Sequence, residues 1–283
     1  MSGGVRRREL RAASVERLRR AGVPSPERDV DELLAHVLGV SLGQLALVEE
    51  VGADPEVRFE ALVVRREARE PLQHLIGTAA FRYVELRVGP GVFVPRPETE
   101  LLAGWAIDEA RRHHDPVVVD LCTGSGAIAK AIADEVPGAH IHAVELDESA
   151  HHWAVLNLAG TGVDLRHGDV ATAFEDLAGT VDVVVCNPPY IPLDAWESVA
   201  REARDHDPHL ALFSGADGLD AMRVLERRSA VLLKPGGVVG AEHAEVQAEA
   251  APAVFSGAGR WESVRDHRDL AGRARYVTAR LAR

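Results

Sequence analysis

The chain carries one short segment whose residue types suit chemistry on a weakly nucleophilic nitrogen, Asn187-Pro188-Pro189-Tyr190, which follows the apolar run Val181–Cys186. The nitrogen of an amide, or of an amino group on an aromatic ring, is a poor nucleophile because its lone pair is delocalised. The side-chain oxygen of Asn187 and the carbonyl of Pro188 can accept its hydrogens side by side, and Tyr190 offers a flat face for stacking. The segment therefore predicts an alkylation site for a planar amide or amine. A proline turn that merely ends a strand is the alternative.

A glycine-rich turn is the second pattern with chemical meaning. The apolar run Val117–Leu121 leads into Cys122-Thr123-Gly124-Ser125-Gly126, and a helical segment opens at Ala127. Small residues let the backbone approach a ligand closely, and a helix N-terminus favours a negative group. At the end of the second candidate strand, Glu145 can accept hydrogen bonds from both hydroxyls of a ribose. This pattern suits NAD as well as S-adenosylmethionine.

Further residues favour S-adenosylmethionine over NAD. Asp120 directly precedes the turn, where its charge suits the ammonium group of a methionine and would repel a pyrophosphate. Asp169 follows the third candidate strand and is predicted to bind the adenine amino group, with Val170 lining the ring. For Asp120 and Glu145, solvated acids at strand ends are the alternative interpretation.

From residue 117 onward, short apolar runs alternate with helical segments. This alternation predicts an α/β fold with a parallel sheet covered by helices on both faces. The carboxyl ends of the first and fourth strands flank the switch point of such a sheet, which places residues 187–190 beside the cofactor turn. Residues 275–281 are expected to form a late strand at an antiparallel edge. The candidate strands are 117–121, 141–145, 165–167, 181–186 and 238–242, and the candidate helices are 127–135, 149–158 and 219–233.

The first part of the chain has a different pattern. Between residues 10 and 69 the apolar residues recur at helical spacing, interrupted by prolines and Gly39. Residues 71–97 are richer in aromatic and β-branched residues and in glycines, which indicates a β-hairpin followed by an irregular loop. We therefore expect a helical domain over residues 1–72, a β-hairpin linker over 73–97 and a cofactor-binding domain over 98–283.

The composition is that of a globular protein. The 283 residues are 46% hydrophobic and carry a formal net charge of −12, which argues against a broad phosphate-binding surface. Cys122 and Cys186 are the only cysteines and lack metal-ligand spacing, so we expect reduced thiols and no metal site. Neither a secretory signal nor an apolar run long enough for a membrane span is present, so a cytoplasmic location is expected.

Together these motifs closely resemble the release-factor glutamine methyltransferase (PrmC/HemK) family, over nearly the whole chain. The specific signature is the combination of residues 94–100, Val-Pro-Arg-Pro-Glu-Thr-Glu, with residues 187–190. Further matches are residues 211–213, 217–220, 233–237, 242–243 and 269–273. The resemblance implies a class I S-adenosylmethionine-dependent methyltransferase fold, Rossmann-like with a seven-stranded, mostly parallel sheet, preceded by a small helical domain and a β-hairpin linker.

The resemblance also implies an activity and a set of site residues. The expected reaction is methylation of the side-chain amide N5 of the glutamine in the Gly-Gly-Gln motif of class 1 peptide chain release factors, which supports translation termination. S-adenosyl-L-methionine would be the donor and S-adenosyl-L-homocysteine the product. The protein is expected to act as a monomer on a protein substrate, without direct contact to nucleic acid or membrane. Its expected donor site is Cys122 to Gly126, Glu145, Val170 and Asn187. The expected glutamine site is Asn187, Pro188, Pro189 and Tyr190, of which Asn187, Pro188 and Tyr190 are the expected catalytic residues. Arg96, Pro97, Glu98 and Thr99 are expected to cover the pocket and bind the substrate, with a domain linker as the alternative.

The sequence departs from the family pattern at several positions. Cys122 stands where glycine is more common, Glu145 where aspartate is more frequent, and Val170 where relatives can carry an aromatic residue. None of the thirteen histidines is assigned a catalytic role. For His243 beside Glu242 a pocket role and a satisfied pair at a strand end are both open.

Three other functions compete with the family assignment. An adenine-N6 methyltransferase would use the same loop, but it would have to extrude the base from a stacked nucleic acid. An NAD-dependent oxidoreductase would share the glycine turn and leave residues 187–190 unexplained. A non-catalytic module that docks on release factors would need neither the donor site nor the acceptor site.

Overall fold

The computed structural model describes residues 5–283, which divide into two compact units. The smaller unit runs to Thr78 and includes Ala200–His206, and the larger unit comprises Ala79–Val199 and Asp207–Arg283. The first division of the chain therefore falls after Thr78, whereas the sequence-based boundaries lie at 72 and 97. Those domain boundaries remain a prediction.

The smaller unit is a helical bundle. Its helix α2 illustrates why the helices form where they do: it begins at a proline, whose fixed φ suits the first turn, and ends at Gly39, whose φ of +66° only glycine adopts readily. Apolar residues at helical spacing, among them Leu33 and Leu34, form its fully buried core. Glu202 forms ion pairs with Arg66 and Arg69, which attaches residues 200–206 to the bundle. The elements are β1 (Val5–Arg6), α1 (Arg7–Arg20), α2 (Pro26–Leu38), α3 (Leu42–Leu45), β2 (Glu50–Val51), α4 (Ala53–Glu67), α5 (Leu72–Ile76) and α9 (Arg201–His206).

The larger unit contains a seven-stranded sheet with the strand order β10-β11-β9-β8-β5-β6-β7. The neighbouring strands β9, β8, β5, β6 and β7 are parallel to one another, whereas β11 pairs antiparallel with both β9 and β10. This topology confirms the predicted α/β fold class. The strands are β5 (Val117–Leu121), β6 (His140–Glu145), β7 (Asp164–His167), β8 (Val181–Cys186), β9 (Leu233–Glu242), β10 (Trp261–Arg268) and β11 (Ala274–Leu281).

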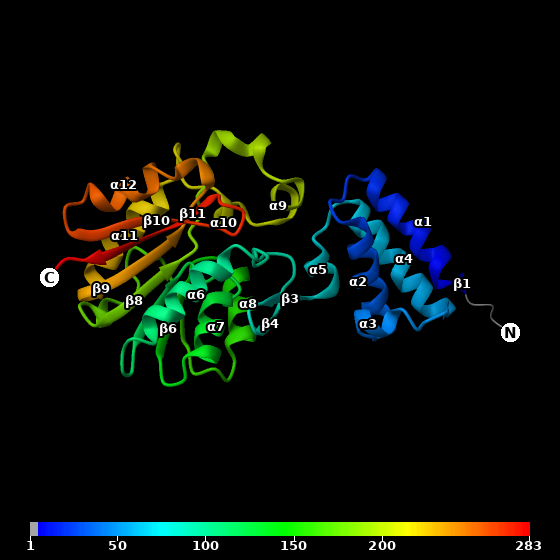
Figure 1. The fold of residues 1–283 in the computed structure, drawn as a ribbon, viewed down its shortest axis with the longest axis horizontal. Helices are drawn as coiled ribbons and strands as arrows, with labels where there is room; N and C mark the ends of the chain where they lie inside the picture. The colour runs from blue at the N-terminus through cyan, green and yellow to red at the C-terminus, as the bar shows by residue number, and fades with distance from the viewer. Residues whose placement is uncertain (1–4) are drawn as a thin grey trace. The chain divides into compact units, whose positions relative to one another are not determined.

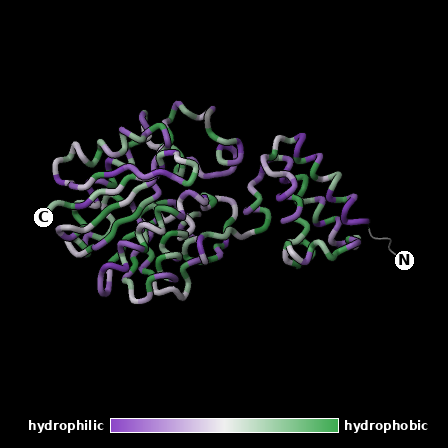
Figure 2. The backbone as a smooth tube through the Cα atoms, in the orientation of Figure 1, coloured by the Kyte–Doolittle hydropathy of each residue, from purple (hydrophilic) through white to green (hydrophobic). Residues whose placement is uncertain are grey.

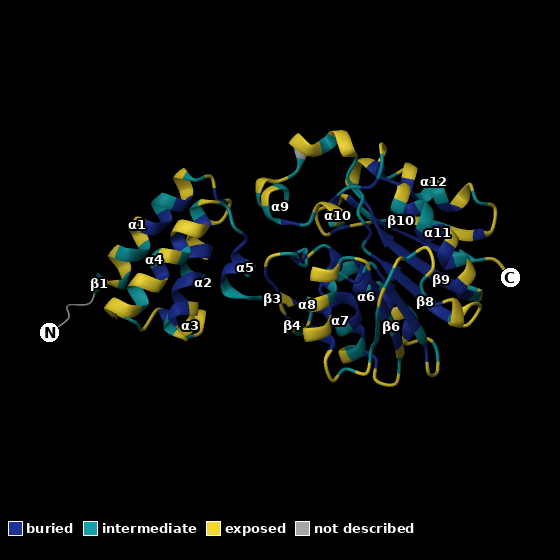
Figure 3. Cartoon of the chain, turned by 180° about the vertical axis from the view of Figure 1, so that it is seen from behind, coloured by how far each residue is buried: buried dark blue, intermediate teal, exposed yellow. Residues whose placement is uncertain are grey.

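Helices cover both faces of this sheet (Figure 1). Helices α6, α7 and α8 pack on one face, and α11 and α12 pack on the other. The central strands β5 and β8 are buried along almost their whole length, while the helices expose their outer surfaces (Figure 3). The helices of this unit are α6 (Thr99–Ala110), α7 (Ala127–Glu135), α8 (Glu148–Leu158), α10 (His209–Leu212), α11 (Asp220–Leu232) and α12 (Ala250–Ser256), with short 3-10 turns η1 (Glu175–Leu177), η2 (Leu193–Ser198) and η3 (Glu245–Gln247).

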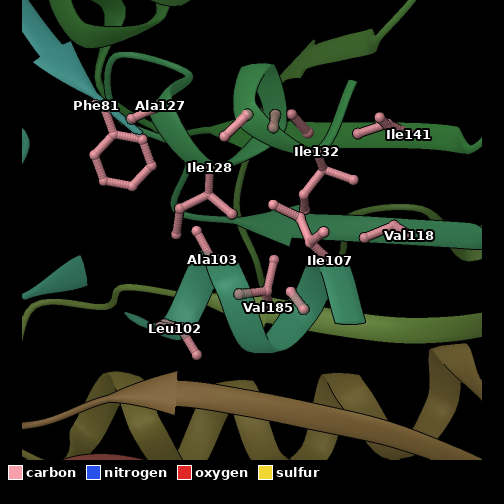
Figure 4. Packing of buried hydrophobic residues seen from close by; sticks show 14 of the residues in the cluster. Phe81, Leu102, Ala103, Ile107, Val118, Ala127, Ile128, Ile132, Ile141 and Val185 are labelled. Carbon is pink, nitrogen blue, oxygen red and sulfur yellow. The ribbon is translucent and has the colours of Figure 1, made fainter. Parts of the chain in front are cut away.

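Each strand sends successive side chains to opposite faces, and this produces two cores. In β5, Val118 lies in the core beneath α6 and α7, whereas Val119 and Leu121 lie in the core beneath α11 and α12. Figure 4 shows the first core, in which Ile107 of α6 and Ile132 of α7 lie over the sheet. Hydrophobic residues are concentrated in the strands of the sheet (Figure 2), as expected for a sheet that is buried on both faces.

Two expectations for the C-terminal part are wrong. Residues 275–281 do form an antiparallel strand, but β11 lies inside the sheet and β10 forms the edge. Most of the side chains of β10 are polar and partly exposed, as on many edge strands, so no apolar pattern marked it. The strand expected over 238–242 begins earlier, at Leu233, because its first half includes a Pro-Gly-Gly sequence and has no continuous apolar pattern. The helix expected over 219–233 is present as α11.

The predicted hairpin is present as β3 (Thr78–Phe81) and β4 (Val84–Arg87), and residues 72–76, expected to belong to the hairpin region, form α5 instead. Asn157 of α8 ties β4 to the glycine turn: its amide donates to the carbonyls of Arg87 and Ser125, and its oxygen accepts from the Arg87 N–H. Within residues 5–283, no helix combines the length and the apolar character needed to cross a bilayer.

Candidate active site

The sheet topology brings the two chemical segments of the sequence together. Strands β5 and β8 are parallel neighbours, with Leu121 opposite Cys186. The glycine turn after β5 and the Asn187-Pro188-Pro189-Tyr190 segment after β8 therefore leave the same edge of the sheet side by side. This edge is the switch point, where ligands of open α/β sheets bind.

The turn after β5 has the backbone conformation that small residues permit. Gly124 and Gly126 have φ values of +57° and +83°, and a Cβ on Gly126 would lie 3.0 Å from the Leu158 side chain. Cys122 also has a positive φ, +59°, which explains why glycine is favoured at this position. A cysteine there carries a conformational cost of roughly 1 kcal/mol.

Glu145, at the end of β6, is attached directly to this turn. Its Oε2 accepts a hydrogen bond from the Gly124 N–H at 2.8 Å, and its Oε1 accepts from the N–H groups of Leu146 and Asp147 at 2.9 Å. Burial raises the pKa of Glu145, and these hydrogen bonds oppose the rise. Since a carboxylate offers about four acceptor sites, one remains on Oε2 for a ribose hydroxyl.

Asp120 lies beneath the turn and is fully buried. Its Oδ2 accepts from the Thr123 hydroxyl at 2.5 Å and from the Ala129 N–H at 3.1 Å. Its Oδ1 is buried and has no hydrogen-bond partner among the described residues. Burial raises the pKa of Asp120 to about 7 against these hydrogen bonds. An acid whose second oxygen lacks a partner is suited to balance a positive charge close to the turn.

The adenine-side residues are less constrained. Asp169 is exposed, and its Oδ1 accepts from the Ala171 N–H. Val170 is half-buried and packs against the core beneath α11. Neither side chain is hydrogen-bonded to another predicted site residue, so their adenine-binding roles remain predictions.

A chain of hydrogen bonds links the Asn187-to-Tyr190 segment to two other elements. The amide nitrogen of Asn187 donates to the Thr99 hydroxyl at 3.2 Å, and Thr99 donates to Glu242 Oε2 at 2.7 Å. The other oxygen of Glu242, Oε1, accepts from the Tyr190 hydroxyl at 3.2 Å. Glu242 is 2% exposed, and burial raises its pKa to about 7. Burial also raises the pKa of Tyr190, which keeps its hydroxyl protonated.

Gln247 and Gly218 also support the Asn187-to-Tyr190 segment, through the backbone of Tyr190. Gln247 donates to the backbone carbonyls of Tyr190 and Asp217 at 3.0 and 3.1 Å. A Cβ on Gly218 would lie 2.3 Å from the Tyr190 carbonyl oxygen, so only glycine fits against it. This contact explains the glycine in the Asp-Gly-Leu-Asp sequence at 217–220.

Of the predicted pocket cover, only Thr99 reaches Asn187 by a hydrogen bond. Arg96 forms an ion pair with the buried Asp207 at 2.8 Å, and Glu98 pairs with Arg273 at 3.4 Å. Pro97 is exposed. These contacts anchor residues 96–99 at both sides of the network, and a substrate-binding role for Arg96, Pro97 and Glu98 remains a prediction.

Sequence patterns alone did not identify Glu242, Gln247, Asp207 or Asn157 as parts of the site. All four are buried polar residues. Glu242 follows an apolar run and lies in the matched segment 242–243, whereas no apolar run marks Asp207 or Gln247. His243 is fully buried and is hydrogen-bonded to Asp266 at 3.0 Å and to the Ala244 carbonyl. It is a satisfied pair at a strand end.

A parallel sheet with an antiparallel C-terminal pair, a glycine turn after its first strand and an acid after its second defines a class I methyltransferase. The model of the PrmC N-terminal domain matches residues 9–77, and that of the methyltransferase small domain matches residues 97–204. A protein described as release factor glutamine methyltransferase from Streptomyces coelicolor is 58% identical over 273 residues, covering 96% of each chain. The chain therefore belongs to the release factor glutamine methyltransferase family.

The chain is also similar to other methyltransferases. A release factor glutamine methyltransferase of Mycolicibacterium smegmatis is 44% identical over 96% of both chains. A 4-amino-L-phenylalanine/4-methylamino-L-phenylalanine methyltransferase of Streptomyces pristinaespiralis is 42% identical and covers 82% of this chain and 80% of its own. The solved structure of a T. thermophilus 16S rRNA N2 G1207 methyltransferase matches with a TM-score of 0.53 at 20% identity, over 73% of this chain and 50% of that chain, and supports the fold alone.

Proposed function

We propose that this protein transfers a methyl group from S-adenosylmethionine to the side-chain amide N5 of the glutamine in the Gly-Gly-Gln motif of class 1 release factors. The observation that carries the proposal is the position of Asn187 beside the glycine turn, at the same sheet edge. The names of relatives that share almost the full length of the chain support the choice of substrate.

The donor site is formed by the turn and its two acids. The glycine turn at the N-terminus of α7 and the acceptor capacity of Glu145 suit a carboxylate and a ribose, respectively. Asp120 adds a buried negative charge for the ammonium group. When bound, S-adenosylmethionine supplies an electrophilic methyl group on a sulfonium.

The chain's own residues act on the acceptor. Asn187 Oδ1 and the Pro188 carbonyl accept the two amide hydrogens of glutamine and hold its nitrogen with the lone pair toward the methyl group. The same two oxygens stabilise the positive charge that grows on nitrogen as the bond forms. The alkylated nitrogen is strongly acidic and loses its proton afterwards, so no residue has to act as a base before transfer.

Two rival functions use the same chemistry on an aromatic amine. One is methylation of the amino group of a nucleobase, and the other is methylation of 4-amino-phenylalanine. The net charge of −12 disfavours a polyanionic substrate. The aryl-amine relative is the more serious rival because the match covers 80% of its length and 82% of this chain. Its identity of 42% is below the 58% of the S. coelicolor protein.

Parallel transfer assays with labelled donor distinguish these functions. Equal concentrations of a purified class 1 release factor, single-stranded DNA and RNA, and 4-amino-L-phenylalanine are offered in separate reactions. We expect transfer to the release factor only. Transfer confined to either nucleic acid or to the aryl amine would refute the proposal, and an Asn187→Ala variant serves as the inactive control.

A further inference from the structure

When Glu242 is ionised, the hydrogen-bond chain from Asn187 to Glu242 can run in one direction only. Glu242, when ionised, can only accept hydrogen bonds, and it accepts the single hydroxyl proton of Thr99 at 2.7 Å. The Thr99 oxygen is thereby left as an acceptor for Asn187, 3.2 Å away. The group that Asn187 presents to Thr99 must therefore be its NH2.

The opposite orientation of the Asn187 carboxamide is disfavoured. A flip would place Oδ1 against the Thr99 oxygen, so two acceptors would face one another without a proton between them. Buried polar groups that face one another without a shared proton destabilise the arrangement that contains them. Thr99 is 4% exposed, so little water is available to compensate.

We infer that Thr99 and Glu242 are positioning residues that orient the Asn187 carboxamide so that its oxygen faces the methyl acceptor. Neither residue has to touch the substrate for this role. The assignment of the acceptor as an amide rests on the proposed function, whereas the orientation of the carboxamide does not.

Glu242 also holds the other end of the segment. Its Oε1 accepts from Tyr190, so one carboxylate fixes both the first and the last residue of the Asn187-to-Tyr190 segment. Burial is the strongest influence on Glu242 and disfavours its ionised form, whereas the hydrogen bonds from Thr99 and Tyr190 and the nearby Arg275 favour it. Two elements therefore fix the position of the segment: α6 through Thr99, and β9 through Glu242.

Three variants isolate the hydroxyl of Thr99. Thr99→Val keeps the shape and removes both hydrogen bonds, Thr99→Ser restores the hydroxyl, and Thr180→Val makes the same exchange at an exposed site. We expect Thr99→Val to lower kcat about tenfold, the loss of roughly one oriented hydrogen bond, with the donor dissociation constant within about twofold of wild type. Thr99→Ser should recover most of kcat, and Thr180→Val should match wild type.

The orientation can also be observed without any substrate. The chain contains two asparagines, Asn157 and Asn187. Protein labelled with nitrogen-15 on the asparagine side chains therefore gives two amide pairs in a proton–nitrogen NMR spectrum. Because Asn157 donates to the carbonyls of Arg87 and Ser125, its signals serve as the internal reference.

We expect Thr99→Val to shift the Asn187 side-chain signals and to speed their exchange with water, while the Asn157 signals stay in place. Unchanged Asn187 signals, or a kcat equal to that of wild type, would overturn the positioning role. If wild-type protein failed to methylate any release factor while the Asn187 signals still shifted, the proposed substrate would be wrong and the carboxamide orientation would stand.

Discussion

Replacing Glu145 by glutamine tests the donor site with the smallest change of shape. The three N–H groups of Gly124, Leu146 and Asp147 all point at the Glu145 carboxylate. A glutamine oxygen can serve the pair from Leu146 and Asp147, but its NH2 then faces the Gly124 N–H, donor against donor. The variant therefore loses an acceptor both for the turn and for the ribose.

The size of the effect follows from the hydrogen bonds lost. The conflict with Gly124 destabilises the donor-free and the donor-bound protein alike, so only the lost ribose hydrogen bond changes the affinity. A hydrogen bond to a charged group contributes about 1.5–3 kcal/mol, which corresponds to a roughly 10-fold to 150-fold weaker affinity for S-adenosylmethionine. Turnover at saturating donor should change far less, since Asn187 is untouched.

Calorimetric titration with S-adenosylmethionine measures this loss directly. Glu148→Gln is the matched control, because Glu148 is exposed on α8 and close in sequence. Circular dichroism establishes that both variants are folded. A Glu145→Gln dissociation constant within about threefold of wild type would refute the role assigned to this carboxylate.

Asp120 and Glu242 have folded-state pKa values raised to about 7, so the folded protein binds more protons than the unfolded chain between pH 4 and 7, and stability falls as pH rises through this range. Between pH 6 and 8 each group should remove about 1 kcal/mol of donor-free stability; melting curves of Asp120→Asn should show a weaker pH dependence, and an unaltered dependence would contradict the assignment. Asn187→Ala should nearly abolish turnover and keep the wild-type melting temperature, as measured by single-turnover transfer and thermal unfolding; a wild-type rate would disprove the mechanism. Glu202→Gln removes the partner of Arg66 and Arg69, so limited proteolysis should cut residues 200–206 faster than in wild type, and equal cleavage rates would count against that anchor.

The sequence was sufficient for those elements whose apolar pattern reflects burial. Strands β5 and β8 and helix α7 were predicted at their observed bounds, because continuous apolar runs and a glycine turn mark the centre of a parallel sheet. The edge strand β10 was missed, since its side chains are mostly polar and its place is set by pairing with β11. The position of an edge strand depends more on pairing with its neighbour than on an apolar pattern in its own sequence.

The same distinction applies to the site. Asn187, Glu145 and the glycine turn could be identified because their spacing from strand ends is local in sequence. Thr99 and Glu242 lie 88 and 55 residues from Asn187, and their connection through hydrogen bonds arises only when α6, β8 and β9 pack together. Contacts of this range leave no periodic signal in one sequence.

The most direct test of the central claim is to map the methyl group on a reconstituted product. A purified class 1 release factor is incubated with the protein and S-adenosylmethionine, digested, and analysed by tandem mass spectrometry. We predict a single added methyl group on the side-chain nitrogen of the Gly-Gly-Gln glutamine, absent with Asn187→Ala. An unmodified glutamine in a reaction that consumes donor, or a methyl group on any other residue, would contradict the account.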